Sequence, residues 1–308
     1  LIAPVVTAFV GIDYKDVNRG AVKKHGVEIE LKHKNNVGRD WFYELGAKLS
    51  LNENRITEYE DLPYAADYQK YAGTPYGAQR SGETTVDSGF FTSIDDIHNY
   101  PVYAGEWSAV IPGIYKPLDY NGDGKLDTND LHCIAGSTAS PAIYSFDLGL
   151  SYKNFSFSVL FYGTRGKYST YNKNFIEEFT KQDYIIHKSQ LDYWTPTNQD
   201  ASHAALMFGL SPFSWGGGTS TEGYDVGLEG VTWRSSDYLS LKELYFGYRI
   251  KSRKLSKAAG IDAITVSLTG NNLVTFTSLI EGDPQRTSLS NSYYPIMSTY
   301  KLGLKVSF

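Results

Sequence analysis

Residues 146–161 have the sequence FDLGLSYKNFSFSVLF, in which apolar and polar side chains alternate on both sides of a central Lys153-Asn154 pair. Strict alternation places one set of side chains on one face of a β-strand and the other set on the opposite face. The segment therefore predicts two strands joined by a tight turn, with one apolar face and one face in contact with water. The apolar positions are Phe146, Leu148, Leu150, Tyr152, Phe155, Phe157, Val159 and Phe161.

The same period-two pattern recurs along much of the chain. Apolar residues alternate with polar or charged ones in the ranges 27–32, 41–51, 243–250, 264–269 and 300–308. Such repetition is typical of an antiparallel sheet with one apolar face, so we predict an all-β protein. The faces opposite the apolar side chains carry Glu28, Glu30, Lys32, Glu44, Lys48, Lys301 and Lys305.

The lengths of strands and connections favour a membrane barrel over a soluble sandwich. Several alternating runs reach about 9–11 residues, as a tilted membrane strand requires, whereas soluble strands average about 5–6. Tight turns are expected at 35–38 and 153–154, while 53–142 and 164–232 lack a clear strand pattern. Outer-membrane barrels combine short periplasmic turns with long extracellular loops. The alternative is a secreted β-sandwich with insertions, whose apolar faces would form a core.

Composition excludes several classes of protein. The formal net charge is −5, which argues against nucleic-acid binding because such proteins need a basic surface. No apolar run reaches the roughly 18 residues of a membrane helix. One cysteine, Cys133, excludes an internal disulfide framework. Because no nucleophile, zinc-protease or phosphate-loop motif occurs, we expect no enzymatic activity.

One local motif predicts a metal site. Residues 119–130, DYNGDGKLDTND, match the calcium-loop pattern D-x-[DN]-x-[DN]-G. A hard cation takes about six to eight oxygen ligands, and this spacing wraps them around one point. Because the last position is Asp and not the longer Glu, we expect a structural Ca²⁺ site of weak affinity. The expected ligands are Asp119, Asn121, Asp123, the carbonyl of Lys125, Asp127 and Asp130.

Aromatic residues gather in the long connections, notably in 57–80 and 211–224. Trp215 and Tyr224 are the candidate substrate contacts, because such rings stack on sugars or pack on partners, although packing between loops is the simpler alternative. Residues 173–194 are expected to form a short amphipathic helix on the loops. A secreted, Ca²⁺-dependent carbohydrate-binding sandwich would share these features and is the competing function.

Motifs in a fixed order give the chain a resemblance to a known family. The motifs are KHGVEIEL at 24–31, GFF at 89–91, PG at 112–113, the 119–130 loop, YWTPTN at 193–198, LSLKELYFGY at 239–248, GNNLVTFT at 270–277, DP at 283–284, and the terminus from YP at 294–295 to Phe308. Together they resemble the C-terminal part of a SusC/RagA-like TonB-dependent outer-membrane receptor of Bacteroidetes, although Ser240 stands where that family often has Arg.

The resemblance implies that residues 1–308 are the C-terminal portion of a large antiparallel transmembrane β-barrel with long extracellular loops. The plug domain and the N-terminal strands would lie outside this chain. It also implies an outer-membrane location, contact with membrane lipid, TonB-driven import of an oligosaccharide or peptide, and a SusD-like surface lipoprotein on the extracellular loops. TonB would act through the absent N-terminal region.

For such a barrel, the positions of the charged faces and of the last strand can be predicted. The charged faces of the strands would line the lumen. Residues 298–308 would form the strand that closes the barrel against its first strand, because lipid cannot satisfy an open sheet edge.

Overall fold

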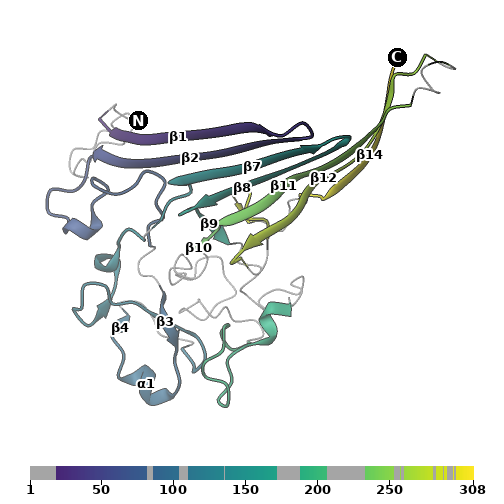
Figure 1. The fold of residues 1–308 in the computed structure, drawn as a ribbon. Helices are drawn as coiled ribbons and strands as arrows, with labels where there is room; N and C mark the ends of the chain where they lie inside the picture. The colour runs from purple at the N-terminus through teal and green to yellow at the C-terminus, as the bar shows by residue number, and fades with distance from the viewer. Residues whose placement is uncertain are drawn as a thin grey trace.

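The structure is a computed structural model that describes residues 19–81, 86–103, 110–134, 136–171, 188–206, 233–252, 257, 260–279, 282–286, 288–289, 294 and 296–308. Its main element is a seven-stranded sheet in which neighbours pair antiparallel and lie in chain order (Figure 1). The predicted all-β class with a large antiparallel sheet is confirmed. Its strands are β1 (Ala21–Val37), β2 (Trp41–Glu58), β7 (Ala142–Tyr152), β8 (Phe155–Arg165), β11 (Tyr238–Ile250), β12 (Ala263–Thr277) and β14 (Thr299–Ser307).

Short turns join the first two pairs of strands at one end of the sheet. Lys153 and Asn154 separate β7 from β8 as predicted, and Lys153 adopts a φ of 53°. The turn between β1 and β2 lies at 38–40, later than the predicted 35–38. The reason is that residues 35–37 still pair with 41–43 of β2, so the ladder continues up to Gly38 with its φ of 66°.

Within the described residues, no second layer covers the apolar face of the sheet. Leu31 is 66% exposed, Phe146 43% and Leu302 81%, although all three carry large apolar side chains. In a β-sandwich this face would pack against a second sheet about 10 Å away. The structure therefore disfavours the sandwich alternative and fits a sheet whose apolar face meets lipid.

The buried clusters lie in the long connections. Phe91, Ile114 and Leu126 form one cluster, and Phe90 and Trp194 belong to another. Figure 1 shows these connections gathered below one end of the sheet, away from the C-terminus. Their elements are β3 (Val86–Phe90), α1 (Ile94–His98), β4 (Val102–Tyr103), β5 (Tyr115–Pro117), β6 (Lys125–Leu126), β9 (Tyr168–Tyr171), β10 (Trp233–Ser235), β13 (Ser288–Leu289) and the 3-10 helices Asp67–Gln69, Thr128–Asp130 and Lys188–Leu191.

Helices contribute little to the described part of the chain. Among those residues, no helix has the length and apolar character needed to cross a membrane. Most of the helix expected over 173–194 falls outside the described residues, and the part that is described begins with the 3-10 helix Lys188–Leu191.

Candidate functional site

The sheet face opposite the apolar side chains is charged, as the alternation predicts. Glu30 of β1 forms ion pairs with Lys32 at 2.9 Å and with Lys48 at 3.2 Å. The register places Lys48 of β2 directly beside Glu30, and all three side chains are exposed. The remaining charged residues of the predicted lumen set occupy the same face, namely Glu28, Glu44, Lys301 and Lys305.

A glycine makes room for charge on this face. Gly46 of β2 pairs with Asp147 of β7, and a Cβ at this position would collide with the Asp147 carboxylate. The small residue therefore allows an acidic side chain to lie flat across the neighbouring strand. The result is a face of the sheet that can stay in contact with water.

The predicted metal loop is folded tightly by its own side chains. The Asp119 carboxylate accepts the backbone N–H groups of Gly122 at 2.7 Å and Gly124 at 2.9 Å. The side chains of Asn121 and Asp123 each accept a backbone N–H two residues further on, both at 2.8 Å. Gly122 and Gly124 have φ values of 73° and 81°, which side chains with a Cβ disfavour.

Asp130 closes the loop from within. Its side chain has an exposed fraction of 0% and accepts the backbone N–H groups of Tyr120, Asn121 and Asp127 at 2.9, 3.3 and 3.0 Å. Burial raises the pKa of Asp130 above its usual value, although the three hydrogen bonds act in the opposite direction. This buried carboxylate therefore ties the start of the loop to its end.

The donor chemistry of the loop suits Ca²⁺, but its carboxylates do not converge. Within the described ranges, no three or more His, Cys, Asp or Glu side chains group in a way that would hold a metal ion. A carboxylate offers about four lone-pair sites, so Asp119 and Asp123 keep acceptor capacity beyond their backbone bonds. Asp130 is the least suited of the expected ligands, because it is fully buried and already accepts three backbone N–H groups. Calcium binding stays a prediction.

The loop anchors a distant part of the same connection. Tyr68 donates a hydrogen bond from its hydroxyl to the carbonyl of Asn129 at 2.7 Å, and its ring lies 5.0 Å from that of Tyr120. Tyr120 in turn stacks on His132, with ring centroids 3.9 Å apart. Tyr68, from the 57–80 stretch, therefore serves a contact between loops, which is the simpler of the two interpretations of these aromatic residues.

A buried lysine was not found by sequence reasoning. Lys167, between β8 and β9, is 7% exposed and donates hydrogen bonds from Nζ to the carbonyls of Pro284 at 2.9 Å and Arg286 at 2.8 Å. Burial lowers the pKa of this lysine. It ties the segment of the Asp-Pro motif to the connection between β8 and β9. No local pattern marks Lys167, because its partners lie 117 and 119 residues away.

Two further sequence predictions cannot be placed. Trp215 and Tyr224, the candidate substrate contacts, lie outside the described residues.

Comparisons with curated proteins give TonB-dependent receptors, although no family model matches the chain. The chain is 30% identical over 211 residues to TonB-dependent receptor P26 of Formosa agariphila, covering 64% of this chain and 20% of the relative. It is 22% identical over 304 residues to TonB-dependent receptor SusC of Bacteroides thetaiotaomicron, covering 94% of this chain and 27% of the relative. The chain thus spans only 20% to 27% of the length of these relatives.

Solved structures show the same fold. The structure of the RagAB peptide transporter matches with a TM-score of 0.66 and 21% identity, covering 100% of this chain and 32% of that one. The RagAB peptide importer in its open-open state matches with a TM-score of 0.67 and 19% identity, covering 100% and 31%. The resemblance read from the sequence motifs is confirmed. The matched structures are described as a peptide transporter and a peptide importer, which agrees with the expectation that the chain belongs to a non-enzymatic family.

Proposed function

We propose, from the homology of this chain to SusC/RagA-like TonB-dependent receptors of the outer membrane, that it forms part of the barrel wall of a nutrient importer. The observation that carries the proposal is the seven-stranded sheet with an exposed apolar face, a charged opposite face and its long connections below one end. The apolar face then meets lipid, the charged face lines an aqueous lumen, and the connections face the outside of the cell.

The imported substrate is, in this proposal, a glycan fragment or an oligopeptide. Support comes from the RagAB structures, which are described as a peptide transporter and a peptide importer. A two-component complex of this kind supports a SusD-like surface lipoprotein as the partner on the loops. Import would be driven by TonB, as the name shared by the relatives suggests.

The test uses the full-length receptor in its native membrane. Uptake of labelled oligopeptides and oligosaccharides is measured in the parent strain, in a receptor deletion, and in a strain without TonB. We expect one ligand class to lose uptake in both deletions, and we expect extraction of the receptor to need detergent. Unchanged uptake of both classes after receptor deletion would refute the proposal.

We also propose that the 119–130 loop binds one structural Ca²⁺ through Asp119, Asn121, Asp123, Asp127, Asp130 and the Lys125 carbonyl. The oxygen-only donor set and the tight turns at its two glycines support this. The ion would neutralise the carboxylates and fix the shape of the loop. Metal analysis of the purified receptor, dialysed against millimolar Ca²⁺, is expected to give one bound ion, and finding none would contradict the proposal.

A further inference from the structure

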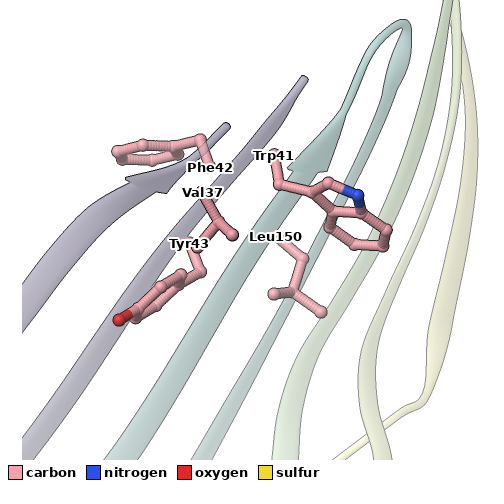
Figure 2. A pocket seen from close by; sticks show the side chains of 5 residues that line it. All are labelled: Val37, Trp41, Phe42, Tyr43 and Leu150. Atoms are coloured by element: carbon pink, nitrogen blue, oxygen red, sulfur yellow. The ribbon is translucent and has the colours of Figure 1, made fainter. Parts of the chain in front are cut away.

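Two hollows lie side by side on the apolar face, along β2 near its short turn. The hollow nearer the turn has a volume of about 300 Å³ (Figure 2). In this view the Trp41 and Leu150 side chains lie toward β7 and the Phe42 and Tyr43 rings lie toward β1. It is lined by Val37, Trp41, Tyr43 and Leu150 of the apolar face, and by Phe42, whose position belongs to the opposite face.

The second hollow continues further along the same strand. It has a volume of about 280 Å³ and forms where the small Ala47 stands between Leu31 of β1 and Phe146 of β7. Tyr43 borders the first hollow and Leu45 borders the second, so the two hollows follow one another along residues 41–47 of β2. We call the two hollows together the β2 groove. The second hollow is lined by Leu31, His33, Leu45, Ala47 and Phe146 of the apolar face, and by Lys32 and Gly46, whose positions belong to the opposite face.

The β2 groove has the length of one membrane leaflet. Ala47 lies six positions after Trp41, which corresponds to about 20 Å of strand. At the tilt of about 35–45° found in membrane barrels, this length rises about 15 Å along the membrane normal. The hydrocarbon core is about 30 Å thick, so the groove spans about half of it. A single acyl chain of the leaflet nearer the short turns has the matching length.

The end of the groove at the short turns carries aromatic rings and cations. Trp41 packs on Tyr152, with ring centroids 4.4 Å apart. The Lys153 ammonium lies 5.1 Å from the Tyr152 ring centroid and 3.8 Å from the carboxylate of Asp40. Arg39 is exposed in the same turn as Asp40. Two cations against one carboxylate leave a positive rim, and aromatic girdles of this kind lie at the depth of lipid headgroups.

We propose that the β2 groove binds one phospholipid of the periplasmic leaflet, with an acyl chain along residues 41–47 and its phosphate between Arg39 and Lys153. The inference rests on the proposed barrel, because it requires the apolar face to lie in lipid. The charge of the rim complements an anionic phosphate. A protein segment is a poorer occupant, since its backbone polar groups would lack partners at this depth.

The test is native mass spectrometry of the delipidated full-length receptor titrated with phosphatidylethanolamine. Ala47→Trp fills the groove, and the double variant Arg39→Ala/Lys153→Ala removes the rim cations. Val266→Trp on the apolar face of β12 and Lys251→Ala after β11 are the matched controls. We expect the wild type and both controls to retain one lipid, and both groove variants to bind it at least about tenfold more weakly.

Equal lipid retention in the wild type and the double variant would overturn the inference, even if Ala47→Trp failed to assemble. Outer-membrane level and substrate uptake are measured on the same variants. Loss of the lipid with normal uptake would support the groove site and leave the importer function intact. A wild-type receptor that bound the lipid in the groove but imported nothing would count against the importer function alone.

Discussion

Asp96 shows how loop packing sets the chemistry of one residue. Its carboxylate pairs with Lys116 at 2.9 Å, and the Lys116 ammonium lies 5.6 Å from the ring centroids of both Phe91 and Tyr100. Burial alone would raise the pKa of Asp96, but hydrogen bonds from Lys116 and Thr92 outweigh it and leave the pKa below its ordinary value of 3.8. A lowered carboxyl pKa stabilises the folded loop above the unfolded pKa, and this stability is lost as pH falls through the folded pKa.

We expect Asp96→Asn to weaken α1 and its surroundings by about 1–3 kcal/mol, since a charge-assisted hydrogen bond is lost. Hydrogen-exchange protection of residues 92–98, corrected for intrinsic rates, should be constant well above the ordinary pKa of 3.8 in the wild type and should fall as the pH drops below 3.8. The variant should lose this dependence on pH. Asp67→Asn is the control, because the Asp67–Lys70 pair is 98% exposed at the aspartate and surface pairs contribute little. Equal effects of both substitutions would contradict the argument.

A substitution at a single residue, Asp123, also tests the proposed Ca²⁺ site in the 119–130 loop. Asp123→Ala removes an expected ligand and the acceptor of the Lys125 N–H. We expect faster hydrogen exchange in residues 112–142 in the presence of millimolar Ca²⁺, with protection of the long strands unchanged. Asp95→Ala, in α1 outside the loop, is the control. If added Ca²⁺ protected wild type and variant equally, Asp123 would not be a ligand.

The long strands were predictable because each carries its own period-two signal. What the sequence did not show is where tertiary contacts shift a strand. The register of β11 changes between Leu241 and Glu243 against both of its neighbours, so Lys242 falls at an irregularity that alternation does not reveal. The short strands in the long connections could not be predicted from the sequence for a related reason. β4 and β6 are two residues each and pair with one another across more than twenty residues, so they exist only through the packed loops.

Leu148 of β7 tests the assignment of the faces for a whole element. It lies between Leu45 of β2 and Val159 of β8, on the apolar face near the middle of the strands. An Arg here should cost about 2–4 kcal/mol if the position lies near mid-bilayer, measured by unfolding of the full-length receptor in bilayers. Ser158→Arg on the charged face is the control and should cost less. A spin label at position 148 that reported contact with water instead of lipid would contradict the assignment of this face to lipid, and with it the proposed barrel.

At the scale of the whole molecule, the described sheet has two edges. β1 and β14 are the first and last strands in its spatial order. β14 pairs with β12 from Asn271↔Thr299 to Ala263↔Ser307, and within the described residues its other edge has no strand. An open edge in lipid leaves backbone groups unsatisfied at a cost of several kcal/mol each, so the assembled receptor must pair this edge.

β14 is therefore predicted to close the barrel against the first strand of the full-length receptor. Its apolar face bears Leu302 and Leu304, 81% and 71% exposed, and its opposite face bears Lys301 and Lys305, as a lipid-facing closing strand requires. Deleting residues 300–308 should abolish assembly in the outer membrane, and removing Phe308 alone should reduce it. Surface labelling of the full-length receptor measures both effects, with Lys305→Ala as a control that leaves the apolar face intact. A receptor without residues 300–308 that reached the surface at the normal level would show that another strand closes the barrel.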